Sequence, residues 1–119
     1  MKEIKEIPDL AWTEQARREI ALTGQALLDQ SDFAWVIGNL AICGLLYRNF
    51  LNPPWFWFAL TEGITIRDLI DFRRLKELIP QGALTAVDES FGEGMRFARL
   101  YGFEDTGLRE AGYHIYRRA

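Results

Sequence analysis

The stretch WFWFAL, residues 55–60, is apolar at every position, and it decides how we expect the chain to fold. A strand with apolar side chains on both faces is typical of the centre of a mixed sheet that is covered on both sides. Pro53 and Pro54 come directly before it, and prolines cannot donate ladder hydrogen bonds, so the strand should begin at Trp55. The alternative interpretation of the run is an exposed aromatic patch for a partner protein.

A glycine turn and a helix are predicted after this strand, over residues 61–80. Gly63 follows the strand, Thr65 occupies the position of an N-cap, and Pro80 ends the helical pattern. A strand, a glycine and a helix start form the geometry that binds phosphate on free backbone N–H groups. Gly63, Ile64 and Thr65 are therefore the candidate cofactor-binding residues.

An amphipathic helix is predicted in the N-terminal part of the chain. Its apolar positions recur at spacings of four, four, three and four, at Trp12, Ala16, Ile20, Thr23 and Leu27. Such spacing places all five side chains on one face of a helix of about five turns. We expect this face to pack against the sheet.

A β-hairpin is predicted over residues 32–50, DFAWVIGNLAICGLLYRNF. Gly38-Asn39 is a two-residue turn with glycine first, which is typical of a type II′ hairpin. The returning strand is expected to run from Leu40 to Phe50, with Gly44 as a candidate bulge.

The rest of the chain predicts four further elements: a short edge strand at Ile4–Ile7, a strand at residues 82–87, a helix from the Ser90 region to Tyr101 with Gly102 as its stop, and two strands around Ala111-Gly112. Ser90 and Glu93 have the spacing of a capping box. The class is therefore α/β, with an N-terminal helix, a central buried strand, two later helices and a C-terminal hairpin on a mixed sheet.

The composition limits the function classes. With 119 residues we expect a single domain over 1–119, and a net charge of −3 with a pI of about 5.2 argues against a dedicated nucleic-acid surface. Cys43, the only cysteine, is expected to be a buried apolar residue. The apolar runs Leu40–Leu46 and Pro53–Leu60 are shorter than the roughly 20 residues of a membrane span, and the start MKEIKEIPDL has no signal-peptide core. We expect a chain that is neither secreted nor membrane-spanning.

The order of elements, together with RFARLYGFEDTG at residues 96–107, resembles the GNAT acetyltransferase fold. That family ends its last helix with a Gly-Phe pair, matched here by Gly102-Phe103, and closes with a hairpin. Within the family, the chain is most similar to the GNAT-like internal virion proteins (protein A) of short-tailed phages. Trp55-Phe56, Arg96-Phe97 and the aromatic segment Tyr113–Tyr116 carry this narrower resemblance.

The resemblance implies acetyl-CoA beside the central strand, but the loop after that strand departs from the family pattern. The family has Arg or Gln, two residues, Gly, one residue, and Gly or Ala before the helix. Here only Gly63 remains, no basic residue precedes the helix, and Glu62 stands where anionic phosphates would approach. Two like charges about 4 Å apart repel by about 1 kcal/mol in water. We therefore expect Gly63 only to turn the chain from strand to helix. We expect acetyl-CoA to bind only if the chain is an enzyme.

The resemblance also implies catalytic positions. Family enzymes often use a tyrosine five residues before the Phe of the Gly-Phe pair, and this position is Ala98, which cannot donate a proton. Tyr101, about 300° further around the helix, is the candidate acid. Asp88 or Glu89 is the candidate general base. The alternative interpretation, which we favour, is a polar strand-to-helix loop with Ser90 as a capping serine. The only histidine, His114, is expected to be structural, and no zinc-type spacing of Cys and His exists.

Three functions remain open. The first is a non-catalytic GNAT-fold phage protein, in the host cytoplasm or the virion, that contacts other virion or assembly proteins or a second copy of itself. Its four Trp and eight Phe would serve as interface anchors. The second is an N-acetyltransferase that moves acetyl from acetyl-CoA to an amine. The third is an unrelated small α/β binding module.

Overall fold

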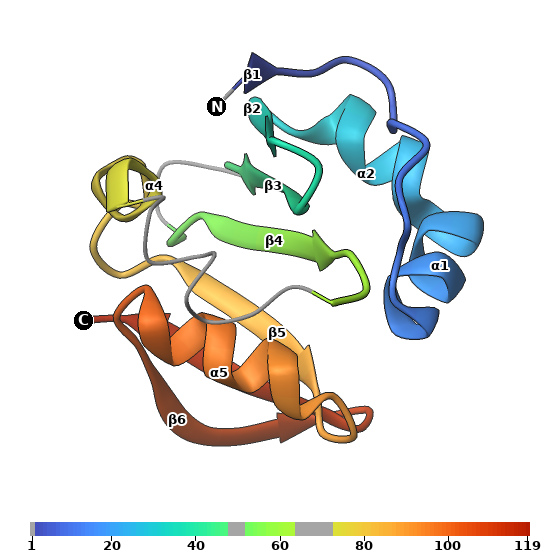
Figure 1. The fold of residues 1–119 in the computed structure, drawn as a ribbon. Coiled ribbons are helices and arrows are strands. Elements are labelled where there is room, and N and C mark those ends of the chain that lie inside the picture. The colour runs from blue at the N-terminus through green and yellow to red at the C-terminus, as the bar shows by residue number, and fades with distance from the viewer. Residues whose placement is uncertain (1, 48–51, 64–72) are drawn as a thin grey trace.

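The computed structural model of the chain describes residues 2–47, 52–63 and 73–119. Their strands form one mixed sheet in the order β1-β2-β3-β4-β5-β7-β6 (Figure 1). The bounds are β1 Lys2–Glu3, β2 Phe33–Ile37, β3 Ala41–Leu46, β4 Trp55–Leu60, β5 Leu84–Asp88, β6 Phe103–Glu110 and β7 Tyr113–Arg118. Only β4 and β5 pair in parallel. The predicted α/β class and mixed sheet are confirmed, and the apolar run at residues 55–60 is the central strand.

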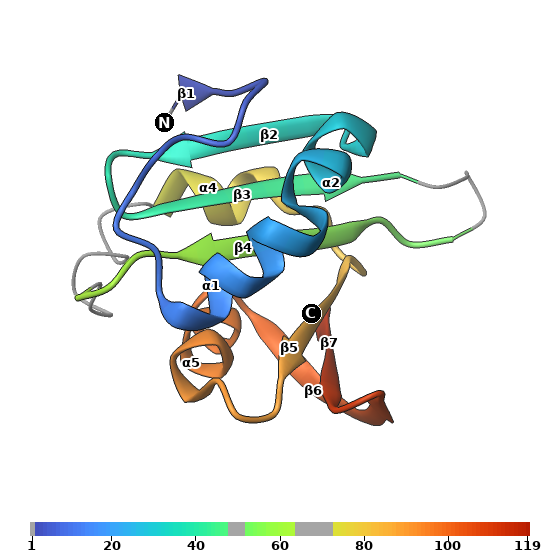
Figure 2. The ribbon, with the colours of Figure 1, turned by 90° about the vertical axis from the view of Figure 1, so that its right-hand side faces the viewer.

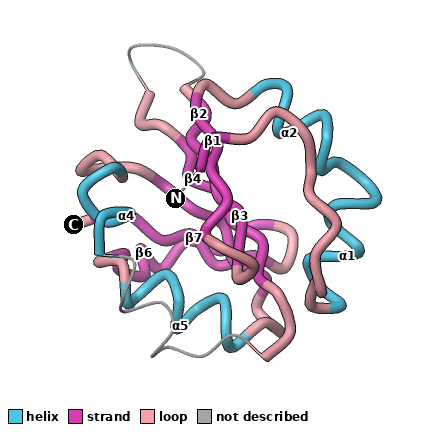
Figure 3. The backbone as a smooth tube through the Cα atoms, turned by 45° about the horizontal axis from the view of Figure 1, so that its top comes forward, coloured by secondary structure: helices cyan, strands magenta, loops and turns pink. Residues whose placement is uncertain are grey.

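Helices cover both faces of this sheet. Their bounds are α1 Glu14–Glu19, a π-helical turn η1 Ile20–Gly24, α2 Gln25–Gln30, α4 Arg73–Leu78 and α5 Gly92–Leu100. The continuous segment α1-η1-α2 lies on one face, and α4 and α5 lie on the other (Figures 2 and 3). Within the described residues, no helix is both long and apolar enough to cross a membrane.

Two apolar clusters lie on opposite faces of the sheet. The larger one faces α4 and α5 and holds most of the buried aromatic side chains, among them Phe56, Phe97, Tyr101, Phe103 and Tyr116. Its rings are packed against one another, with Phe56 and Phe97 stacked at 6.3 Å between centroids. The smaller cluster, under the α1-η1-α2 segment, has only four buried members, Trp12, Ala16, Ile42 and Ala59. Much of the aromatic excess in the sequence is therefore used in the core.

The N-terminal helix forms, but it begins at Glu14 with Thr13 as its N-cap, so Trp12, predicted as its first apolar position, lies before the helix and bridges to Thr61. The buried side of the helix also changes along its length. The π turn contains one more residue per turn than α geometry, so it rotates everything after it. Ala16 and Leu28, twelve residues apart, are both buried, whereas Leu27 is only half-buried and Thr23 is exposed. Ile20, Thr23 and Leu27 still face the sheet together, as predicted, but Thr23 is exposed and Leu27 half-buried, so this part of the face is not fully covered.

The β2–β3 hairpin is confirmed, but the predicted two-residue turn is wrong, because Ile37 pairs with Ala41 and the loop therefore has three residues, 38–40. Gly38 has φ +53°, and the Leu40 amide donates to the Ile37 carbonyl at 3.0 Å. The predicted bulge at Gly44 is wrong, because Gly44 pairs regularly with Ala34 and Trp57. The returning strand is β3, which begins at Ala41 instead of Leu40 and ends at Leu46. Residues 48–50 of the predicted strand lie outside the described residues.

The role of Gly44 is close packing. A Cβ atom at this position would lie 2.5 Å from three adjacent atoms of the Trp57 indole. The indole therefore covers the backbone of Gly44 with the face of its ring, and only glycine leaves room for it.

Two local predictions at element starts are wrong. Residues Ile4–Ile7 do not form the edge strand, because Ile4 and Ile7 pack under the N-terminal helix while Lys2–Glu3 pair with β2. The capping box at Ser90 does not form either. The Ser90 amide and hydroxyl both donate to Asp88 Oδ1, at 2.8 and 2.6 Å, and Phe91 takes the N-cap position of α5 without a side-chain bond.

The C-terminal half follows the prediction more closely. Helix α5 ends where expected, with Gly102 at φ +85°, and the strand predicted at residues 82–87 is β5. The closing hairpin turns at Ala111-Gly112, whose φ angles of +50° and +83° fit a type I′ turn.

Candidate functional site

The central feature of the site is a gap between the two parallel strands. β4 and β5 are paired only at Trp55 and Leu84, so the strands separate toward their carboxyl ends at Leu60 and Asp88. The end of β4 is fixed to the start of the N-terminal helix, because the Thr13 amide donates to the Leu60 carbonyl at 3.0 Å. Helix α1 therefore spans the open end of the gap (Figure 2).

A cavity of about 300 Å³ lies between the α1-η1-α2 segment and the sheet at this gap. We call it the helix-side cavity, and it is lined by Ile7, Glu19, Ile20, Thr23, Gly24, Leu27, Ile42, Leu46, Trp55, Phe56, Trp57, Phe58, Ala59, Ala86 and Tyr113. The walls are mainly apolar and aromatic, with few polar groups, as is common for ligand pockets. The π turn supplies one wall, and π turns inside α-helices often occur at functional sites.

The main polar group of this cavity is the Glu19 carboxylate. Its Oε1 accepts a hydrogen bond from Gln15 Nε2 at 2.8 Å and from the Tyr113 hydroxyl at 3.4 Å. Burial raises the pKa of Tyr113, and the negative charge of Glu19 raises it further. Tyr113 is therefore a neutral donor that holds Glu19 in place at neutral pH.

Asp88 extends this polar group at the carboxyl end of β5. Its Oδ2 accepts a hydrogen bond of 3.4 Å from Gln15 Nε2. The Gln15 amide therefore bridges the carboxylates of Glu19 on α1 and Asp88 on β5. The hydrogen bonds from Ser90, and more weakly the one from Gln15, lower the pKa of Asp88. Asp88 is therefore an ionised acceptor that ties α1 to β5, which makes it a poor proton acceptor at neutral pH.

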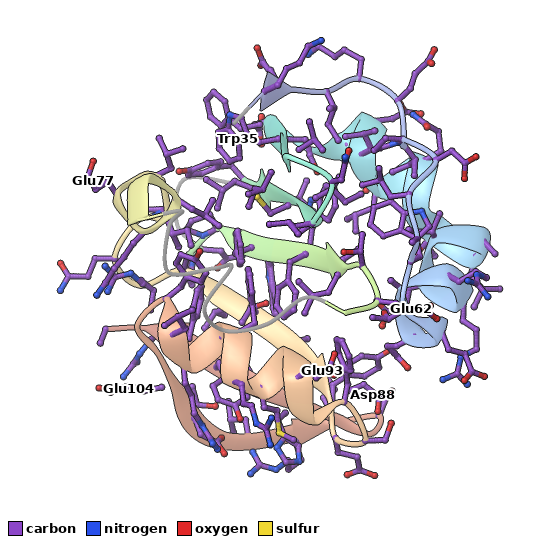
Figure 4. All side chains as sticks on the ribbon, in the orientation of Figure 1. Trp35, Glu62, Glu77, Asp88, Glu93 and Glu104 are labelled. Atoms are coloured by element: carbon purple, nitrogen blue, oxygen red, sulfur yellow. The ribbon has the colours of Figure 1, made fainter. Side chains whose placement is uncertain are left out.

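A second, more open cavity of about 450 Å³ lies beside Gly63, and we call it the loop-side cavity. It is lined by Thr13, Glu14, Gln15, Arg18, Glu62, Gly63, Ser90, Phe91, Gly92 and Glu93. Figure 4 shows Glu62, Asp88 and Glu93 at the same end of the molecule, between α1 and α5. Among the described lining residues, three carboxylates face one cation, Arg18, so this cavity is acidic.

The candidate cofactor residues are only partly described. Gly63 has φ +75° and open space around its Cα, so it makes a left-handed turn directly after the strand, as expected of a turn glycine. Ile64 and Thr65, and with them the predicted N-cap, lie outside the described residues.

The candidate acid, Tyr101, lies in the large aromatic cluster. Its side chain is 2% exposed, its ring lies 4.9 Å from that of Phe97, and it lines neither cavity. Burial raises the pKa of Tyr101 to about 12. Ala98, at the position of the family's tyrosine, is fully buried in the same cluster, as is Cys43. The prediction that Cys43 is a buried apolar residue is confirmed, and burial raises the pKa of its thiol.

The candidate base, Glu89, lies on the surface outside both cavities. Its Oε2 is 4.0 Å from His114 Nε2, and the two side chains are 64% and 21% exposed. Glu89 is 25 residues from His114 in the chain and meets it only through the pairing of β5 with β7, so sequence spacing does not predict their contact. No group of three or more His, Cys, Asp and Glu side chains that could hold a metal ion occurs among residues 2–47, 52–63 and 73–119.

Sequence reasoning missed Gln15, Glu19 and Tyr113. Gln15 and Glu19 are four residues apart on the predicted helix, a spacing that would have shown their hydrogen bond. Nothing local connects Tyr113 with Glu19, which lies 94 residues earlier in the chain. No model of a known protein family matches the chain, and no curated protein is significantly similar to it.

Proposed function

We propose that this chain is a non-catalytic GNAT-like domain that works by contact with other proteins, as a component of a short-tailed phage virion or of its assembly. The order of helices and strands supports the fold part of the proposal. It agrees with the order that resembles the GNAT family: a helix after the first strand, a central strand next to a parallel one, and a closing hairpin.

The observation that carries the non-catalytic part is the charge of the loop-side cavity. Gly63 is the remaining glycine of the loop that would hold a pyrophosphate, and the cavity beside it has the carboxylates of Glu14, Glu62 and Glu93. Arg18 neutralises one of them at most. An anionic cofactor would meet a net negative field there, and like charges at about 4 Å cost roughly 1 kcal/mol each in water.

The proton-transfer groups support the same conclusion. Ala98 has no acidic proton, and Tyr101 is enclosed by the aromatic cluster, away from both cavities. A general acid must come within hydrogen-bond reach of the atom that it protonates. Glu89 faces His114 on the surface, outside both cavities. The expected acid and base are thus not brought together around a common space.

One observation favours the second candidate, an acetyl-CoA-dependent N-acetyltransferase. The helix-side cavity opens at the gap between β4 and β5, beside the central strand, and Glu19 supplies a carboxylate there. A carboxylate in a partly apolar cavity is a general-base candidate. This alternative requires acetyl-CoA to bind despite the acidic lining beside Gly63.

Titration with acetyl-CoA by calorimetry, together with thermal unfolding, tests the proposal. An enzyme whose cofactor is present at 100 times its Kd should be stabilised by about 2.7 kcal/mol. We expect no saturable heat and no rise in Tm up to millimolar acetyl-CoA. The double variant Glu62→Gln with Glu93→Gln is the matched comparison, since it removes two charges beside Gly63 without changing side-chain size.

Saturable binding of acetyl-CoA that Gly63→Val abolishes would contradict the non-catalytic proposal, because Val does not adopt the φ of +75° found at this position. For the virion part, mass spectrometry of purified particles and of assembly intermediates should detect the protein. Its absence from both in infected cells that make it would contradict that part alone.

A further inference from the structure

The helix-side cavity contains a carboxylate without a cationic partner. Among the described residues, no Lys, Arg or His nitrogen lies within 4.0 Å of the Glu19 carboxylate. The Glu19 carboxylate accepts two hydrogen bonds, both on Oε1, from the neutral groups of Gln15 and Tyr113. The nearest basic residue in sequence, Arg18, donates to Gln15 Oε1 and lines the other cavity. This carboxylate can therefore receive a cation that is supplied from outside the chain.

Another part of the cavity wall is aromatic and fixed in position. Trp57 lines the cavity, covers Gly44 with its ring face, and donates from Nε1 to the Ser31 hydroxyl at 2.7 Å. The indole is thus held at its edge and on one face. The aliphatic stem of a long side chain that enters the cavity can pack along such an apolar wall.

Gly24, in the π turn, lines the cavity without a side chain beyond Cα, which leaves room on that wall.

We infer that the helix-side cavity receives an arginine side chain of a partner protein, with the guanidinium on Glu19 and the aliphatic stem along the apolar wall. This inference names the anchor of the proposed protein contact and rests on that proposed function. The fork of N–H donors in a guanidinium matches the two oxygens of a carboxylate, and arginine is enriched among the residues that dominate interface energies. The charge complementarity argues for a basic side chain over an apolar one.

The test is a titration followed by two-dimensional ¹H–¹⁵N NMR, with N-acetyl-arginine-N-methylamide as the probe. We expect saturable shifts of the Glu19, Thr23 and Gly24 amides and of the Trp57 indole N–H. The citrulline analogue has nearly the same shape without the charge, and it should bind at least about tenfold more weakly, since a hydrogen bond to a charged group contributes about 1.5–3 kcal/mol.

Variants separate the cavity from general charge effects. Glu19→Gln should weaken arginine binding by about tenfold or more, whereas Tyr113→Phe should weaken it less, because it removes only the group that positions Glu19. Glu77→Gln is the control, since Glu77 is exposed on α4, on the opposite face of the sheet (Figure 4). It removes one negative charge and should leave the binding unchanged.

Three results would overturn the assignment: no saturable shift with the arginine probe, equal binding of the matching lysine amide, or arginine binding that survives Glu19→Gln in a folded variant. The acetyl-CoA titration is independent of these. A chain that binds neither ligand loses the cavity assignment alone, and one that acetylates an amine loses the proposed function.

Discussion

The two faces of the central strand differ in how completely they are covered. On the face toward α5, Phe56 and Phe58 pack against Phe97 in the large aromatic cluster. On the face toward the N-terminal helix, Trp57 borders the helix-side cavity. The sequence of the strand is equally apolar on both sides. An apolar strand therefore shows which element is central, but it does not show that both of its faces are filled.

The largest expected effect is on the filled face. Phe97→Ala removes a ring that is 1% exposed and contacts several aromatic neighbours, so we expect the free energy of unfolding to fall by about 3–5 kcal/mol. Leu27→Ala removes a half-buried side chain that borders the cavity, and we expect it to cost well under half as much. Urea unfolding of both variants measures the two costs. Equal costs would show that the faces are packed alike.

A pair of enlarging substitutions tests the same contrast by adding side-chain volume to each face. Ala98 is fully buried under α5, so Ala98→Leu must displace neighbours and should cost about 1–3 kcal/mol. Ala86 is exposed on β5 and lines the cavity, so Ala86→Leu has space and should change stability by less than about 0.5 kcal/mol. The same substitution at two sites keeps the chemistry constant. If Ala86→Leu destabilised as strongly as Ala98→Leu, the cavity would not be open in solution.

The smallest expected effect concerns Asp88, which accepts hydrogen bonds from Gln15 and Ser90. Hydrogen bonds from Ser90 lower the pKa of Asp88 below its ordinary value of 3.8, so the folded state favours the ionised form. The resulting stability is present above about pH 4 and is lost as the pH falls through the lowered pKa. We expect the wild-type protein to have a slightly higher Tm than Asp88→Asn at pH 6, and the difference to shrink toward pH 2. A difference that stays constant with pH would show that ionised Asp88 does not stabilise the fold.

The fold could be predicted to the level of its element order. The apolar run at residues 55–60, the turn at Gly38 and the stop at Gly102 act through local geometry, and each appears where the sequence placed it. Gly44 was misassigned because its reason is a ring from the neighbouring strand, and Ser90 because the Asp88 carboxylate competes for its donors. Such outcomes depend on contacts that sequence spacing does not contain.

The candidate site could be predicted much less well. Reasoning from the resemblance led to Tyr101 and Glu89, of which the first is enclosed in the core and the second faces solvent. The pair of Glu19 with Tyr113 was missed because it joins the first helix to the last strand, and no local signal predicts that approach.

The π turn also bears on how such a cavity can arise. A substitution changes one side chain, whereas one inserted residue that is absorbed as a π turn rotates the whole helix beyond it while the turns before it keep their contacts. Ala16, which precedes the π turn, is buried against the sheet. Beyond the turn Leu28 is buried, whereas Leu27 is only half-buried. The π turn therefore sets how α2 is rotated against the sheet, and Ile20, Thr23 and Leu27, in and after this turn, face the cavity instead of filling it.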